Sequence, residues 1–136
     1  MRRIVGRLCA VLFASISLTV INALPAGASV AAIDAVTCSS YSWTYRRVFN
    51  HPPVFSPPIT CTVTGGVAPY TYNWLNVGGD QVTKPTSQSS NSTSFKRGVA
   101  NGGDWISYWR LYAFDSVGSI AASPLVTVEI EWENGQ

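Results

Sequence analysis

Residues 62–74 have the sequence TVTGGVAPYTYNW, in which a glycine pair separates two stretches of alternating apolar and polar side chains. The apolar positions are Ile59, Cys61 and Val63 before the glycines and Tyr70, Tyr72 and Trp74 after them. A period of two residues is typical of a half-buried β-strand, because successive side chains of a strand point to opposite faces. The stretch therefore predicts two strands that turn at Gly65-Gly66, with Pro69 fixing the backbone where the second strand begins.

The same alternation continues toward the C-terminus. Residues 105–115 and 126–132 each alternate in this way, and residues 115–118 (DSVG) are typical of a hairpin turn. No window after residue 30 has apolar side chains at helical spacing over three turns. Six or seven short strands predict an all-β fold, an antiparallel immunoglobulin-like β-sandwich. An up-and-down barrel is the alternative, which fits less well because the strands are few and short.

The N-terminus has the composition of an export signal. Three arginines within residues 2–7 precede an uncharged apolar run over residues 8–24, and residues 26–28 have the A-x-A spacing that signal peptidase cleaves. The run is at the short limit of a membrane-spanning helix. We therefore predict a secretory signal peptide over residues 1–28, with cleavage near Ala31 and an uncleaved membrane anchor as alternatives.

Removal of this signal changes the composition from which function is judged. The precursor carries 9 Lys and Arg against 7 Asp and Glu, a formal charge of +2. The signal contains three of the arginines and no acid, so the mature charge falls to −1. A near-neutral chain does not favour nucleic-acid binding, and no stable membrane insertion is expected after cleavage. The two remaining cysteines, Cys38 and Cys61, predict one disulfide in an exported domain.

The stretch over residues 62–74 resembles the start of immunoglobulin-like and PKD-like domains of bacterial surface proteins and tailed-phage virion proteins. The residues that carry the resemblance are Gly65, Gly66, Pro69, Tyr70, Tyr72 and Trp74, and it extends over about residues 59–132. It implies a sandwich with Trp74 in the core, and it implies little about function, because such domains act as spacers, adhesins and binding appendages alike. Where many immunoglobulin domains have a second core cysteine this chain has Leu111, so that Cys61 pairs with Cys38 or stays a free buried thiol.

We divide the mature chain into an N-terminal strand with a proline-rich aromatic loop, residues 29–58, and the body of the sandwich, residues 59–136. The candidate binding residues of the first part are Tyr41, Trp43, Tyr45, Arg46, Arg47 and Phe49. Aromatic faces beside guanidinium groups suit sugar rings or the hot spot of a protein interface, and prolines lower the cost of ordering a loop. The alternative is structural, namely a first strand that pairs with the sheet and a loop that packs over its edge.

A second candidate surface lies on the face of residues 105–115 that is opposite Trp109 and Leu111. It carries Tyr108, Tyr112 and Phe114. An exposed row of aromatic rings can stack on polysaccharide or be buried against a partner. Cross-strand aromatic pairs that only stabilise the sheet are the alternative.

Residues suited to catalysis or metal binding are scarce. His51 is the only histidine, no G-x-S-x-G motif occurs, and Asp80, Asp104 and Asp115 are isolated in predicted turns. We therefore predict no enzymatic activity, no cofactor and no metal site. The sequence indicates a secreted or periplasmic bacterial module for adhesion or binding to a surface polysaccharide or protein partner. A secreted inhibitor that presents its proline-rich loop to an extracellular enzyme is the alternative.

Overall fold

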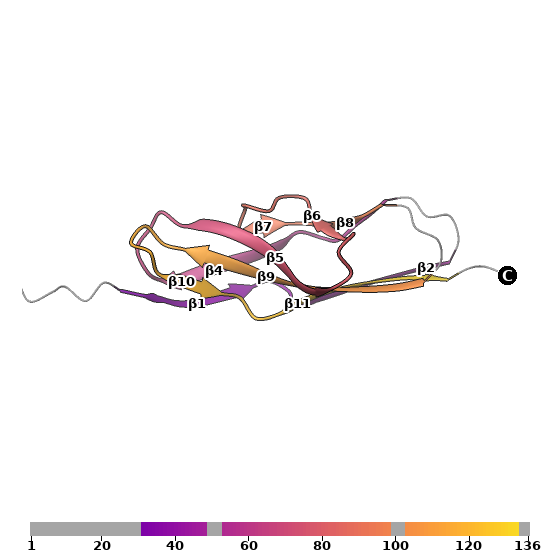
Figure 1. Ribbon diagram of the computed structural model, residues 1–136, viewed down its shortest axis with the longest axis horizontal. Coiled ribbons are helices and arrows are strands. Elements are labelled where there is room, and N and C mark those ends of the chain that lie inside the picture. Colours follow the sequence, from indigo (N-terminus) through magenta and orange to yellow (C-terminus); the bar gives the residue numbers. More distant parts are fainter. Residues whose placement is uncertain (1–30, 49–52, 99–102, 134–136) are drawn as a thin grey trace, which may run out of the picture.

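The computed structural model describes residues 31–48, 53–98 and 103–133. Eleven strands and no helix occupy this part of the chain, and Figure 1 shows that they run along the long axis of an elongated molecule. None of the described residues belongs to a helix long and apolar enough to cross a membrane. The predicted signal peptide, Phe49 and His51 lie outside the described residues.

The larger sheet is built around one long strand. Its members are β2 (Ser42–Val48), β5 (Thr71–Gly79), β9 (Gly103–Phe114), β10 (Ile120–Ala122) and β11 (Val126–Glu133). The central strand β9 pairs antiparallel with β5 on one side and with β10 and β11 on the other. The strand β2 pairs with β11 in parallel, so the sheet is antiparallel except for this pair.

The other six strands form the second layer. They are β1 (Ile33–Cys38), β3 (Val54–Phe55), β4 (Ile59–Gly65), β6 (Lys84–Pro85), β7 (Ser92–Thr93) and β8 (Phe95–Arg97). The hydrogen-bonded orders are β1-β4-β7 and β3-β8-β6, and only Ser94 separates β7 from β8 along the chain. The predicted alternation of β4 is confirmed, because Ile59 and Cys61 are buried and the threonines between and after them are exposed.

A glycine pair ends β4 as the sequence predicts. Gly65 and Gly66 have φ values of 73° and 72°, which side chains with a Cβ adopt poorly. A Cβ on Gly66 would lie 2.7 Å from Cγ1 of Ile33. The Ala68-Pro69 peptide bond that follows is cis, and the hydroxyl of Tyr70 donates to the carbonyl of Gly65 at 2.6 Å.

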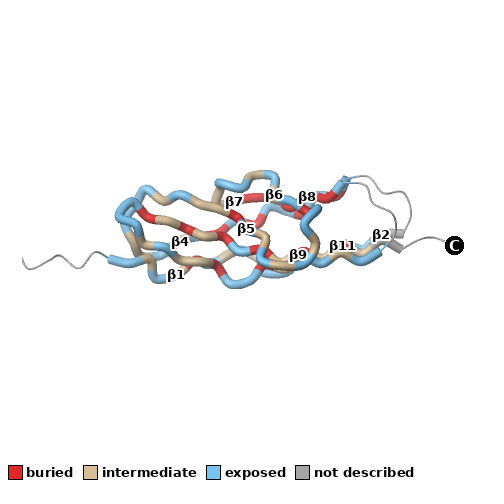
Figure 2. The backbone as a smooth tube through the Cα atoms, viewed as in Figure 1, coloured by how far each residue is buried: buried red, intermediate tan, exposed pale blue. Residues whose placement is uncertain are grey.

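The core lies between the two layers (Figure 2) and is centred on three aromatic rings. The ring of Phe95 contacts Trp74 edge-on at 5.4 Å and Trp109 at 5.2 Å between centroids. Trp74 and Leu111 are both fully buried and lie opposite each other in the β5–β9 pair. The predicted core position of Trp74 is thus confirmed, and Leu111 fills the position of the missing cysteine.

The Cys38–Cys61 disulfide is present, as the sequence predicts. The two cysteines lie directly opposite each other in the β1–β4 pair, and Cys61 is fully buried. The bridge therefore links the edge strand β1 to β4 of the same layer, and no strand of the larger sheet takes part in it.

A serine-proline pair interrupts one strand line in each layer. Ser123 separates β10 from β11, and Ser56 separates β3 from β4. Each serine N–H donates to the carbonyl of a buried core residue, Leu111 or Phe95, whose N–H donates back to the serine Oγ. Each Oγ also donates to the carbonyl of the following proline, and all six distances lie between 2.8 and 3.0 Å. A side-chain oxygen thus replaces a strand carbonyl, so no buried N–H is left unpaired where the strand bends.

Candidate binding surfaces

The aromatic residues of β2 face the interior. Trp43 and Tyr45 stack on each other with centroids 5.9 Å apart, and both pack against the buried pair Val54 and Ile130. Both are half-buried. They extend the core beyond the Trp74 cluster, in agreement with the structural alternative for this segment, a first strand paired with the sheet.

The other candidates of the segment do not form a surface with these two. Tyr41 precedes β2, and its hydroxyl accepts a hydrogen bond from the N–H of Cys38 at 2.9 Å. Arg46 lies on the opposite face of β2 from Tyr45 and forms an ion pair with Glu131. The side chains of Arg47 and Phe49 lie outside the described residues.

Three aromatic residues of β9, in contrast, lie together on the outer face of the larger sheet, while Trp105 and Trp109 face inward. Tyr108, Tyr112 and Phe114 are half-buried, and they alternate with the buried Trp109 and Leu111. The outer face also contains Leu75, Ile106 and Ile120, which are 39%, 37% and 61% exposed, and the exposed Arg110, which lies between Tyr108 and Tyr112 and opposite Leu75. The surface formed by these seven residues is called the outer face below.

Register sets the arrangement of the outer face. Phe114 lies between Thr71 of β5 and Ile120 of β10, and Tyr112 lies between Asn73 and Ala122. Toward the other end of β9 the neighbours become charged. Glu129, Glu131 and Asp104 lie there, with Arg46 paired to Glu131. The outer face is therefore aromatic and aliphatic near the Asp115 turn, has the exposed Arg110 in its middle, and has acidic neighbours at the far end.

The Asp115 turn holds the apolar end of the outer face in place. Its carboxylate accepts hydrogen bonds from the N–H groups of Val67, Val117 and Ser119 at 2.7–3.1 Å. Burial raises the pKa of this carboxyl, but the N–H donors of Ser119, Val67 and Val117 outweigh it, so that the net pKa lies below the ordinary value. The hairpin turn predicted at residues 115–118 is confirmed.

A buried ion pair that the sequence did not predict lies at the end of β5 that is far from the Asp115 turn. Asp80 follows β5 and pairs with Arg97 of β8, whose guanidinium lies 4.2 Å from the ring centroid of Trp105. Asp80 also accepts hydrogen bonds from Thr83 and from the N–H of Val82. Burial raises the pKa of Asp80, yet the hydrogen bonds from Thr83 and Val82 and the charge of Arg97 lower it below its ordinary value of 3.8. One signal was available: Arg97 follows Phe95 by two residues, so an arginine takes an inward position that requires a counter-charge.

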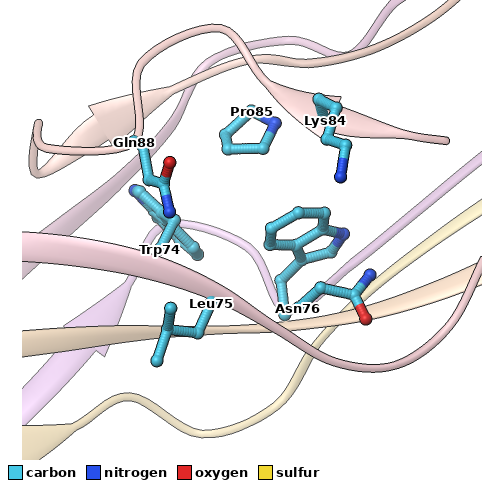
Figure 3. A pocket seen from close by; sticks show the side chains of 7 residues that line it. Trp74, Leu75, Asn76, Lys84, Pro85 and Gln88 are labelled. Carbon is cyan, nitrogen blue, oxygen red and sulfur yellow. The ribbon is translucent and has the colours of Figure 1, made fainter. Parts of the chain in front are cut away.

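A cleft of about 230 Å³ opens between β5 and β6 (Figure 3). The residues that line it are Trp74, Leu75, Asn76, Lys84, Pro85, Gln88 and Trp109. The sequence analysis identified Trp74 only as a core residue and did not find the cleft, because its two sides come from different layers.

Metal ligands are not gathered within residues 31–48, 53–98 and 103–133. No three His, Cys, Asp or Glu side chains lie close enough there to hold an ion. Asp80 and Asp115 accept backbone hydrogen bonds in turns, as predicted, but the turn predicted at Asp104 is wrong, because Asp104 lies in strand β9, whose pairing with β11 extends to Gly103.

No protein-family model matches this chain, and no curated protein matches it. Among solved structures it is similar to the ASH / PapD-like domain 7 of human CEP192, with 10% identity and a TM-score of 0.57 over 92% of this chain and all of that one. It is also similar to the PKD domain of human KIAA0319, with 8% identity and a TM-score of 0.40 over 77% of this chain and 87% of that one. A nucleoside hydrolase-related hypothetical protein from Saccharophagus degradans, associated with carbohydrate metabolism, matches with 16% identity and a TM-score of 0.40 over 66% of this chain and 22% of that one. The likeness to the CEP192 domain and the strand order confirm the predicted immunoglobulin-like β-sandwich.

Proposed function

We propose that the protein is an exported, non-catalytic binding module that contacts a protein partner through its outer face. The observation that carries the proposal is the gathering of Tyr108, Tyr112 and Phe114 with exposed aliphatic side chains on one side of the larger sheet. Exposed apolar surface of this kind, with Arg110 among the aromatic rings, is typical of protein interaction sites, in which aromatic residues and arginine are enriched.

The aliphatic part of the outer face favours a protein over a polysaccharide. Sugar rings stack on aromatic faces and need polar groups at the rim of the site. Tyr108, Tyr112 and Arg110 could supply these groups, but Leu75, Ile106 and Ile120 could not, and their burial against a protein partner is favourable in proportion to the apolar area removed from water. The hydroxyls of Tyr108 and Tyr112 make no hydrogen bond with another described residue, so they are open to a partner at the rim of the contact.

Export is supported by two features. The sequence predicts a signal peptide over residues 1–28. The Cys38–Cys61 disulfide is of a kind that persists in oxidising compartments. Together the two features support a secreted or periplasmic location.

The proposal is tested with the mature chain, residues 29–136, immobilised and incubated with intact cells of the producing organism and with its culture medium. The double variant Tyr112→Ser, Phe114→Ser removes the centre of the outer face. The matched control is Phe55→Ser, which removes an aromatic side chain that is 57% exposed on the other layer. Melting temperatures verify that both variants fold.

We expect the wild type and Phe55→Ser to bind equally and the double variant to bind about tenfold less or not at all, since central aromatic residues carry most of an interface energy. Trypsin treatment of the cells should abolish binding. Binding that survives trypsin indicates a polysaccharide partner and contradicts the proposal. Binding lost in Phe55→Ser and kept in the double variant would instead place the contact beside the proline-rich segment, as the inhibitor alternative requires.

A further inference from the structure

The cleft between β5 and β6 lies at an open side of the sandwich. β5 and β6 do not pair with each other as strands, and the N–H of Trp74, which donates to the carbonyl of Gln88 at 2.9 Å, joins the two layers at the base of the cleft. Figure 3 shows Lys84 and Pro85 on one side of the cleft and Leu75 and Asn76 on the other. Its volume of about 230 Å³ is below the range of roughly 300–1,000 Å³ for drug-sized ligands. A single ring is therefore the size of ligand that fits.

The floor of the cleft is preorganised and apolar. The indole N–H of Trp74 donates to the carbonyl of Ser90 at 3.0 Å, and that of Trp109 donates to Oγ of Ser107 at 3.1 Å. Trp74 is fully buried and Trp109 is 3% exposed, so the indoles support the site while the rim makes most of the contacts. The ring of Pro85 gives the rim an apolar wall.

One carboxamide at the rim is held in a fixed orientation. β5 bulges between Asn76 and Gly78, and Oδ1 of Asn76 accepts the N–H of Gly78 at 3.0 Å. Nδ2 of Asn76 donates to the carbonyl of Asp80 at 2.9 Å. An amide has a second N–H and a second lone pair, so Asn76 can still donate to and accept from a ligand hydroxyl.

Two further polar groups at the rim have no partner in the described part of the chain. The carboxamide of Gln88 and the ammonium of Lys84 make no hydrogen bond or ion pair there, and both residues are exposed. No acidic side chain lines the cleft. The rim therefore combines two carboxamides with one positive charge.

A second observation points to a negatively charged ligand. Lys84 lies directly opposite Lys96 in the β6–β8 pair, and both side chains are exposed. Like charges directly opposite each other destabilise a strand pair. An anion bound beside Lys84 would reduce this repulsion.

We infer that the cleft between β5 and β6 binds one acidic sugar residue, a pyranose ring that carries a carboxylate. Lys84 pairs with the carboxylate, Asn76 and Gln88 bond to ring hydroxyls, and Pro85 contacts the apolar face of the ring. This site is distinct from the outer face, with which it shares only Leu75. It does not depend on the protein partner proposed above.

The inference is tested by two-dimensional ¹H–¹⁵N NMR titration of the mature, oxidised protein with three probes. The probes are D-glucuronate, D-glucose as the neutral ring, and acetate as the carboxylate without a ring. We expect D-glucuronate to shift the amides around Asn76, Lys84 and Gln88 in a saturable manner. D-glucose and acetate should each bind about tenfold more weakly, because each lacks one part of the contact and a hydrogen bond to a charged group is worth roughly tenfold or more in affinity.

Lys84→Ala and Lys96→Ala are the matched pair of variants. Each removes one positive charge and the same repulsion, but only Lys84 lines the cleft. Lys84→Ala should weaken D-glucuronate binding about tenfold and Lys96→Ala by about twofold at most, since an exposed charge outside the contact is screened by salt. An equal loss in both variants, equal shifts with D-glucose or acetate, or the absence of saturable shifts with D-glucuronate would each overturn the inference.

Discussion

The two ends of β5 are each held by an aspartate, and the two aspartates are held in different ways. Asp115, beside the start of β5, accepts hydrogen bonds from neutral groups, the backbone N–H of Val67, Val117 and Ser119 and the side chain of Ser119. Asp80, just after the end of β5, pairs with the charged Arg97 of the other layer. The guanidinium of Arg97 lies against the ring of Trp105. One end is thus closed by a local turn and the other by an ion pair that joins both layers.

The two aspartates therefore support different parts of the fold. Asp115 is only 7% exposed, but Val67 and Val117, whose N–H groups it accepts, are 37% and 51% exposed, so water can reach these donors when the carboxylate is lost. Loss of the Asp80 carboxylate leaves a guanidinium whose side chain is 5% exposed without its counter-charge. We therefore expect a global effect at the Asp80 end and a local one at the Asp115 end.

The largest effect is expected from Asp80→Ala. The free energy of unfolding should fall by about 3–5 kcal/mol, because removing one partner of a buried pair leaves an uncompensated charge. Urea denaturation of the oxidised protein measures this change. The matched control is Asp104→Ala, an exposed aspartate of β9, which should change stability by no more than about 0.5 kcal/mol. Equal effects of the two variants would show that the Arg97 pair does not hold this end.

A smaller effect is expected from Asp115→Ala. Its melting temperature should lie between those of the wild type and Asp80→Ala, because water replaces the carboxylate at the freed N–H groups. Hydrogen exchange should accelerate at Val67, Val117 and Ser119, while Leu111 in the core keeps the wild-type protection after correction for global stability. Loss of protection throughout the core would remove the distinction between the two ends.

The pH dependence of stability should report both carboxyls. Each pKa is lower in the folded protein than its ordinary value of 3.8, so the folded state binds these protons less tightly than the unfolded state. The stabilisation is complete above about pH 5 and is lost as the pH falls below 4 through the folded pKa values. Asp80→Asn and Asp115→Asn should each reduce the slope of unfolding free energy against pH below 4. Neither should change it between pH 5 and 7, and a slope that is unaltered below pH 4 in both variants would contradict the prediction.

The smallest effect is expected away from both ends, at the centre of the outer face. Tyr112→Ser should change the free energy of unfolding by no more than about 1 kcal/mol, because the ring is half-buried and faces outward. Urea denaturation beside the Asp80→Ala variant provides the scale. A loss as large as that of Asp80→Ala would mean that the outer-face rings serve the sheet rather than a partner.

The candidate surfaces show how far sequence patterns could lead. The alternation of β9 was enough to place Tyr112 on the other face of the strand from Leu111, since the period of a strand is fixed by its geometry. The same pattern in β2 could not show whether Trp43 and Tyr45 face the core or the solvent. Their direction depends on the parallel pairing of β2 with β11 and on Val54 of β3, which packs against them.

The sequence by itself determined the local features of this protein. Two-residue alternation, the Gly65-Gly66 turn, the Asp115 hairpin and the pairing of the two mature cysteines each depend on neighbouring residues or on simple counting. The two serine-proline pairs are visible in the sequence, but no familiar motif marks them, and their hydrogen bonds to Phe95 and Leu111, 39 and 12 residues away, appear only in the tertiary structure.

The tertiary structure alone decided what lies between distant strands. The Arg97–Asp80 pair and the cleft beside Lys84 both depend on where β5, β6 and β8 meet, and the outer face depends on β5 and β10 flanking β9. A sequence pattern repeats along one strand and gives no information on which strand comes to lie beside it. That placement follows from burying all apolar faces at once, which is a property of the whole sandwich.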